Sequence, residues 1–183
     1  EGQIFLGAIA VNYLYINTQF NSPTLHIFVL LIAGFAGGSL CILIPAITKV
    51  VFGVNEIITT LLTNYIVFGI TIFLINGPWK DPKSLNFPAA AYVGEEVFLP
   101  TIFGKLSFGF LICILFTALA HYLKNKSVFG FEMRIAGGSA LTAVYAGINA
   151  RQKAFIAMLI GGGFAGLAGA IELLSQTHRV STG

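Results

Sequence analysis

The chain has 183 residues, of which 56% are hydrophobic and only 9% are charged, and its formal net charge is +3. An ordinary globular domain carries roughly a quarter charged residues. These numbers exclude a typical water-exposed surface and indicate that most of this surface faces lipid or other helices. The small, scattered positive charge argues against a nucleic-acid partner. Cys41 and Cys113 lie in apolar runs, where cysteine is usually a small buried hydrophobe, so we expect no disulfide framework, metal site or cofactor.

Hydrophobic runs recur along the chain, and about 20 mostly apolar residues are enough to cross a bilayer. The first run, 4–16, is short, and it is either the tail of a helix that begins upstream or a half-helix. Four longer runs follow at 27–47, 57–75, 107–123 and 154–174. We therefore expect an all-α, polytopic transmembrane helical bundle formed by residues 1–183 as one unit. Because the chain opens without an initiator Met or a signal-peptide n-region, we expect an internal fragment of a longer protein.

The connections between these runs differ in length and charge. Short ones are expected at 17–26 and 48–56, and longer ones at 76–106 and 124–153. Four prolines exclude a continuous helix over 76–106: Pro78, Pro82, Pro88 and Pro100. Six basic residues fall on the side of 124–153: Lys49, Lys124, Lys126, Arg134, Arg151 and Lys153. The other side has four: Lys80, Lys83, Lys105 and Arg179. Since Lys and Arg favour the cytoplasmic side, 124–153 is predicted to be cytoplasmic.

The last span contains Gly161, Gly163 and Gly166 in the spacing G-x-G-x-x-G, which is the spacing of a dinucleotide-binding turn. Such a turn needs a preceding strand and an acidic residue about 20 positions later, and neither is indicated here. Read as a helix, the same stretch places small residues every four positions, which lets membrane helices approach closely. The predicted helix-packing glycines are Gly34, Gly38, Gly162, Gly166 and Gly169.

One face of the 57–75 helix is unusually polar for a membrane span. Six residues share that face, and only one of them is apolar: Glu56, Thr60, Thr63, Asn64, Val67 and Thr71. Two interpretations remain open, namely hydrogen bonding within and between helices or the lining of a solute pathway. The candidate pathway residues are Asn12, Glu56, Thr60, Thr63 and Asn64. Glu56 also suits the first turn of its helix, where the helix dipole favours a carboxylate.

No catalytic constellation is visible in the sequence. The three histidines, His26, His121 and His178, fall at the ends of spans without metal-ligand spacing. The G-x-S-x-G, H-E-x-x-H and P-loop motifs are absent from the sequence. We therefore expect a protein that makes no covalent bond itself.

The loop 124–153 contains the stretch SALTAVYAG, which predicts a short helix with Ser139 as its N-cap and Gly147 just past its end. Four residues recur at helical spacing and give this helix an apolar face: Leu141, Val144, Tyr145 and Ile148. A short amphipathic helix of this kind either lies on the membrane surface or docks into a partner.

Three blocks of the sequence resemble one transporter family. The segment GFEMRIAGGSALTAVYAGINARQKAFIAMLIGGGFAGLAGAIE resembles the late cytoplasmic loop and following span of bacterial ABC importer permeases of the ribose, nucleoside and branched-chain amino-acid type. FGVNEIITTLLTNYI resembles a stretch of the nucleoside and simple-sugar permeases, and EGQIFLGAIA resembles their "VEGQ" helix. The resemblance implies a type II-like ABC importer permease fragment.

The resemblance also implies partners and residue roles. Two permeases would form the solute pathway, with two ATPase subunits bound beneath them and an extracytoplasmic solute-binding protein above. The coupling helix that seats in the ATPase would comprise Ser139, Leu141, Val144, Tyr145, Ala146, Gly147, Ile148 and Asn149. Residues matching family positions near the membrane interior would be Glu1, Gly2, Gln3, Asn55, Glu56 and Asn64. The family's coupling segment usually has an acidic and a basic residue where this chain has Leu141 and Val144, so docking is expected to be more apolar.

The sequence therefore predicts a permease subunit of an ATP-driven importer for a nucleoside or simple sugar, in a bacterial plasma (inner) membrane. ATP hydrolysis is expected on the partner subunit. The alternative is a secondary transporter driven by an ion gradient, with a carboxylate such as Glu56 as its coupling site. The 76–106 segment is either a docking surface for the binding protein or an unstructured spacer.

Overall fold

A computed structural model describes residues 1–183 with the exception of 19, 21, 82–89, 91, 104–105 and 181–183. Pro82, Lys83, Pro88 and Lys105 lie outside the described residues. The elements, in chain order, are α1 (Gly2–Asn17), α2 (Pro23–Phe52), α3 (Glu56–Asn76), the 3₁₀ turn η1 (Glu95–Val97), β1 (Thr101–Phe103), β2 (Leu106–Ser107), α4 (Phe108–Lys126), α5 (Val128–Gly138), α6 (Ala140–Tyr145), α7 (Ala150–Glu172) and the π-helical turn η2 (Leu173–Thr177). The two strands form a small antiparallel hairpin.

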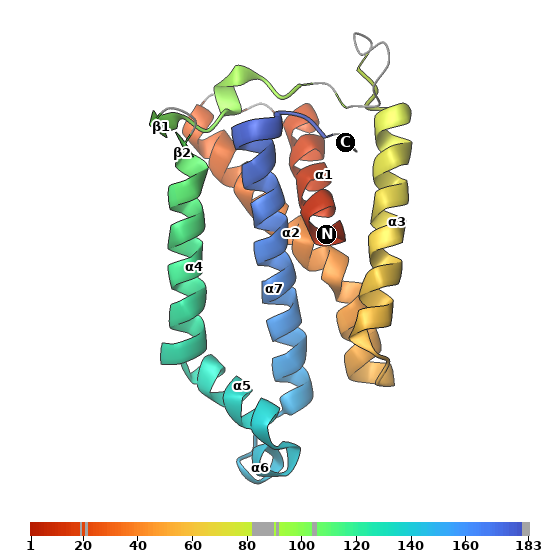
Figure 1. Ribbon diagram of the computed structural model, residues 1–183, viewed down its shortest axis with the longest axis vertical. Helices are drawn as coiled ribbons and strands as arrows, with labels where there is room; N and C mark the ends of the chain where they lie inside the picture. Colours follow the sequence, from red (N-terminus) through yellow and green to blue (C-terminus); the bar gives the residue numbers. More distant parts are fainter. Residues whose placement is uncertain (19, 21, 82–89, 91, 104–105, 181–183) are drawn as a thin grey trace.

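Four helices in the described part of the chain are long and apolar enough to cross a membrane: α2, α3, α4, and α7 continued by η2. They run alongside one another, while the 16-residue α1 lies among them as a shorter helix (Figure 1). The predicted all-α, polytopic architecture is confirmed. The helices are longer than the predicted apolar runs, so the first two connections shrink to 18–22 and 53–55.

Local signals at the helix ends explain these bounds. Pro23 occupies the first turn of α2, where its fixed φ is favourable. Gly53 ends α2 with φ +68°, in the left-handed region that glycine adopts without a Cβ penalty. The Asn55 side chain accepts a hydrogen bond from the Ile57 N–H and starts α3. Ser107 caps α4 in the same way, by accepting from the Gly109 N–H.

The tightly packed centre of the molecule consists of α1, α2 and α7. In the most apolar windows of α2 and α7, 39% of residues are buried, against 17% for α3 and 6% for α4. Buried side chains at this centre include Val11 of α1, Leu30 of α2 and Leu167 of α7. The faces of α3 and α4 that point away from α1, α2 and α7 are covered with exposed large apolar side chains, as expected for helices that contact lipid or further protein.

The segment 92–100, which we call the cap segment, crosses one end of the bundle. Its backbone N–H groups at Val93 and Leu99 donate to the carbonyls of His178 and Leu174, at 2.9 and 3.0 Å. Val93, Val97 and Leu99 are buried. The interpretation of this region as an unstructured spacer is therefore wrong for the described residues, because the cap segment fills apolar space above the bundle and is tied to the residues that follow α7.

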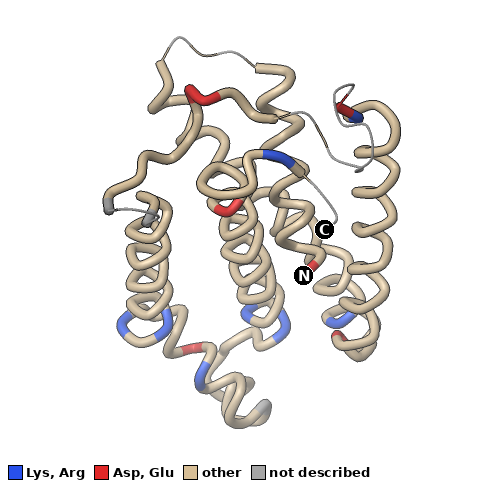
Figure 2. Tube along the Cα trace, turned by 45° about the horizontal axis from the view of Figure 1, so that its top comes forward, with Lys and Arg blue, Asp and Glu red and all other residues tan. Residues whose placement is uncertain are grey.

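The opposite end of the bundle carries α5 and α6, and we call it the α6 end. Figure 2 shows Lys and Arg residues gathered on the helices at this end. The sequence predicts only one short helix in 124–153, but α5 is a second one. Its three glycines weaken the helical pattern. One of them, Gly130, is required by the turn from α4, since a Cβ there would meet the backbone of Leu123 and Lys124.

Candidate functional site

The polar face of α3 points partly into the bundle. Thr63, Val67 and Thr71 are buried, and Asn64 is half-buried. The threonine hydroxyls donate to carbonyls one turn earlier in α3: Thr60 to Glu56 at 2.7 Å, Thr63 to Thr59 at 2.8 Å, and Thr71 to Val67 at 2.8 Å. Each hydroxyl oxygen keeps its acceptor capacity. This face therefore satisfies its donors locally and offers acceptors to whatever lies beside it.

Asn64 connects α3 to the start of α1. Its Oδ1 atom accepts a hydrogen bond of 2.9 Å from the Gly2 backbone N–H. A Cβ at Gly2 would lie 2.7 Å from this oxygen, so the contact needs glycine. A pocket of about 200 Å³ lies here, lined by Glu1, Gly2, Phe5, Leu61, Asn64, Tyr65 and Phe68. The pocket combines the Asn64 amide with aromatic walls within the span.

Asn12 is buried, and its amide nitrogen has no partner within the described part of the chain. It lies ten residues after Gly2 on α1, which corresponds to about 15 Å along a helix axis. The structure therefore does not bring Asn12 beside Asn64, and the two amides do not share one site.

Glu56 lies at the α6 end of α3, away from the middle of the span. Its carboxylate forms an ion pair of 2.7 Å with Lys49 in the last turn of α2, and both side chains are partly exposed. The pair joins two helices across the short turn at 53–55, and each charge also complements its own helix dipole. This arrangement accounts for Glu56 without a proton-relay role.

The helix α6 projects from the bundle at the α6 end (Figure 1). Ser139 caps it by accepting from the Thr142 N–H, and Gly147 follows it with φ +69°. Leu141, Val144 and Tyr145 expose 73%, 74% and 90% of their surface. These three residues form an exposed apolar face, which we call the α6 face.

The remaining residues of the predicted coupling segment lie differently. Ala146 is exposed beside the α6 face, whereas Ile148 is half-buried, so it belongs less to the exposed surface than its spacing predicts. Asn149 caps α7 by accepting a hydrogen bond from the Gln152 N–H at 3.1 Å. Its role in the structure is thus to start α7, the helix that leads from α6 into the bundle.

The candidate packing glycines lie where helices cross. Gly34 and Gly38 of α2 face Gly162 and Gly166 of α7, and a Cβ on Gly166 would lie 2.6 Å from the Gly38 Cα. Gly169 faces the backbone of Ile4 in α1. By contrast, Gly161 is exposed and a Cβ there would meet nothing within 4 Å. The stretch is continuous helix throughout, which is incompatible with a dinucleotide-binding turn.

A pocket near the cap segment was missed at the sequence level. It measures about 500 Å³ and is lined in part by Tyr15, Phe20, His26 and Glu96. The His26 ring stacks on Tyr15 with 5.7 Å between ring centroids. The Tyr15 hydroxyl accepts from the Gly94 N–H at 2.8 Å. These residues come from separate segments, and no spacing in the sequence connects them.

The chain matches, over residues 1–183, the family described as "Branched-chain amino acid transport system / permease component". The chain belongs to this family. Among curated proteins it is similar to a guanosine ABC transporter permease protein of Bacillus subtilis, with 34% identity over 177 residues, covering 94% of this chain and 50% of that protein. It is also similar to a glucose ABC transporter permease protein of Haloferax volcanii, with 27% identity over 98% of this chain and 50% of that protein.

A further relative is a nucleoside ABC transporter permease protein of Lactococcus lactis, with 26% identity over 93% of this chain and 50% of that protein. The chain thus spans about half the length of the curated relatives it matches. No solved structure matches the chain. Membership of the permease family, together with the four long apolar helices, makes this a multi-pass membrane protein. The family is one of permease components of transport systems.

Proposed function

We propose that this chain forms part of the permease subunit of an ATP-binding-cassette importer for a nucleoside, with a simple sugar as the other solute class its relatives represent. The observation that carries the proposal is the family match over residues 1–183, together with guanosine and nucleoside permeases among its relatives. Thr60, Thr63 and Asn64 line the solute pathway, where their oxygen acceptors suit a hydroxylated, uncharged compound. Asn12 is a candidate for a separate polar contact further along α1.

The α6 face docks in a groove of an ABC ATPase subunit. Its three apolar side chains are too exposed to contribute to the fold of this chain, and such an exposed apolar patch is typical of a protein interface. ATP binding closes the ATPase pair and moves α6, and the spans then rearrange to pass the solute inward. The α6 end faces the cytoplasm of a bacterial cell, because most basic residues of the described chain lie there.

Two further partners complete the assembly. A second permease subunit, identical or related, packs against this one to enclose the pathway. An extracytoplasmic solute-binding protein docks on the cap segment, which exposes Tyr92, Glu95 and Glu96 on an ordered backbone. The cap segment thereby transmits the arrival of solute to the residues that follow α7.

The test is ATP hydrolysis by the full-length permease reconstituted with its ATPase and its binding protein. Tyr145→Asp and Leu141→Asp place a charge on the α6 face and should abolish both co-purification of the ATPase and stimulation by loaded binding protein. Thr142→Asp is the matched control, since it adds the same charge to α6 outside that face. Uptake that persists without any ATPase and follows a pH or sodium gradient would refute the proposal in favour of secondary transport.

A further inference from the structure

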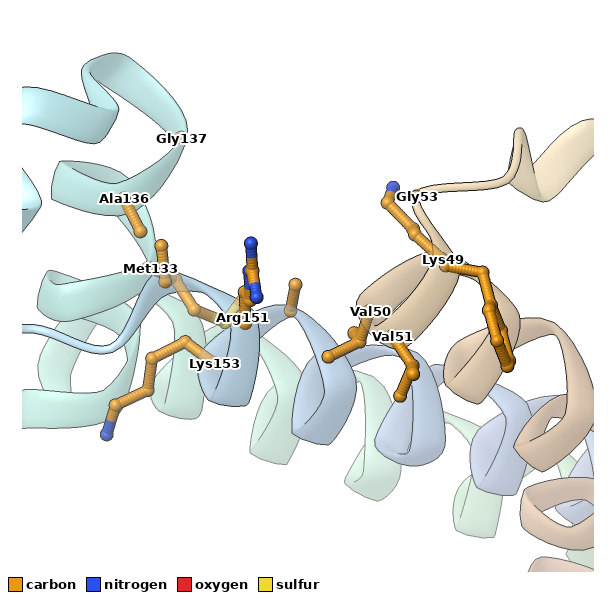
Figure 3. Close-up of a pocket in the computed structure, with 12 residues that line it drawn as sticks. Lys49, Val50, Val51, Gly53, Met133, Ala136, Gly137, Arg151 and Lys153 are labelled. Carbon is orange, nitrogen blue, oxygen red and sulfur yellow. The ribbon is translucent and has the colours of Figure 1, made fainter.

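A groove of about 610 Å³ opens at the α6 end between the last turn of α2, the helix α5 and the first turn of α7. Figure 3 shows Val50 and Val51 of α2 on one side, Met133 and Ala136 of α5 on the other, and Arg151 of α7 standing between them. These three helix segments are far apart in the sequence. The groove therefore exists only because α2 and α7 pack closely while α5 folds back beside α7.

The rim of the groove is cationic. Lys49, Arg151 and Lys153 line it, and none of the described lining residues is acidic. Lys49 pairs with Glu56 at 2.7 Å, and Lys153 pairs with Glu132 at 2.5 Å. Arg151 is exposed and has no acidic partner within the described residues. In Figure 3 the Arg151 and Lys49 side chains extend toward the same side of the groove, whereas Lys153 points away. The groove is therefore lined by one uncompensated guanidinium, Arg151, and by a second cation, Lys49, that is paired with Glu56.

The walls of the groove are apolar and continue onto the lipid-facing surface. Val51 and Phe52 expose 65% and 72% of their surface at the end of α2, directly beside the groove. The groove lies where the long apolar helices α2 and α7 reach their ends, which is the level of lipid head groups in a protein that spans the membrane. A ligand that fits must be anionic at one end and apolar at the other.

We propose that this groove binds an anionic phospholipid. The phosphate accepts hydrogen bonds from the Arg151 guanidinium, which suits bidentate phosphate recognition, and interacts with the Lys49 ammonium. The acyl chains run along Val51 and Phe52. Basic pockets between membrane helices at the cytoplasmic side are a known form of lipid site. Bound lipid joins the end of α2 to α5, the helix that leads into α6.

The proposal needs only the membrane location of the chain, so it is tested without an ATPase. Full-length permease in a neutral detergent is titrated with phosphatidylglycerol, and bound lipid is counted by native mass spectrometry, with phosphatidylcholine as the reference lipid. Arg151→Gln should weaken phosphatidylglycerol binding by about fivefold, which is the loss in affinity expected when one basic residue near an anionic lipid surface is removed. Arg151→Lys keeps the charge but loses the bidentate geometry, so it should bind phosphatidylglycerol more tightly than Arg151→Gln and more weakly than wild type. Ala136→Phe keeps every charge but fills the groove, and it should also lose the lipid.

The matched control is Lys126→Gln, which removes a cation at the same end of the molecule outside the groove lining. If Lys126→Gln and Arg151→Gln lose phosphatidylglycerol binding equally, the proposal is overturned, because binding would then depend on the overall charge of this end of the molecule. If Arg151→Gln binds phosphatidylglycerol normally but no longer co-purifies with the ATPase when the importer is assembled separately, the groove is a protein interface. That result would refute the lipid site but would leave the proposed importer function unaffected. If Ala136→Phe does not fold, the proposal is tested by comparing phosphatidylglycerol binding of Arg151→Gln with that of Arg151→Lys. Equal binding by these two variants would overturn it.

Discussion

Gly166 lies at the point where α7 crosses α2, and its replacement by alanine tests the packing of the whole bundle. A Cβ at this position would lie 2.6 Å from both the Cα and the N of Gly38, and closer still to the Gly34 carbonyl oxygen. All three atoms are backbone, so no side-chain rotation relieves the contact. Ordinary van der Waals contact begins near 3.4 Å, and the shortest of these contacts, to the Gly34 oxygen, must therefore open by about 1.1 Å.

The expected magnitude follows from two opposing terms. Forcing a methyl group into a packed interior costs about 1–3 kcal/mol, whereas Gly→Ala within a helix stabilises by about 0.5–1 kcal/mol. Gly166→Ala should therefore lower the free energy of unfolding by about 1–2 kcal/mol. Gly161→Ala is the matched control on the same helix: nothing lies within 4 Å of its added methyl group, so only the favourable term of about 0.5–1 kcal/mol remains.

The two variants are compared by thermal unfolding of full-length permease in mild detergent. Unfolding is monitored by the reaction of Cys41 with a thiol-reactive dye. Cys41 is buried in α2, so it reacts with the dye when the packing around α2 opens. The exposed Cys113 is replaced by serine in every sample to remove its background signal. Opposite shifts of the unfolding midpoint are expected. Equal midpoints for Gly166→Ala and Gly161→Ala would refute the close approach of α2 and α7.

Three further changes test α3. Asn64→Ala removes the acceptor for the Gly2 N–H and should reduce solute uptake while the ATPase still co-purifies; unchanged uptake would remove Asn64 from the pathway. Asn55→Ala removes the N-cap of α3 and should lower the free energy of unfolding by about 1 kcal/mol, measured by denaturant titration against wild type; no change would mean that the cap is dispensable. Thr71→Val should change that free energy by less than about 1 kcal/mol, because the hydroxyl donates within its own helix; a loss above about 2 kcal/mol would indicate a partner beyond the described residues.

The spans were predictable because their signal is local. A run of apolar residues without a charge must be a buried or lipid-facing helix wherever it packs, and the four longest helices arise from those runs. The residues at which the helices begin and end were less predictable. Residues 48–52 continue α2 past the predicted run to Gly53, because none of them is a glycine or a proline. The helix α5 was missed because Gly130, Gly137 and Gly138 reduce the helical pattern that the sequence displays.

The site was only partly predictable, because its contacts join distant segments. Helical periodicity places Thr60, Thr63 and Asn64 on one face, but it does not reveal that Asn64 meets the first turn of α1. Helical periodicity also does not show that Asn12 lies away from these residues, because the position of α1 along α3 depends on tertiary packing. The lipid groove is a stronger example. Lys49 and Arg151 are 102 positions apart in the sequence, and the close crossing of α2 and α7 brings them to one groove.

The packing of the bundle is uneven, and this determines which helices would move together with α6. The helices α1, α2 and α7 contact one another through glycine backbones, and such contacts tolerate little sliding because no flexible side chain lies between them. The α5–α7 ion pair between Glu132 and Lys153 fixes the base of α6 to this central group. The helices α3 and α4 bury far less of their surface. We therefore expect α6 to move α1, α2 and α7 as one body. The polar face of α3 would then be the surface against which that body shifts, and Asn64 would lie at the boundary that opens in the proposed transport cycle.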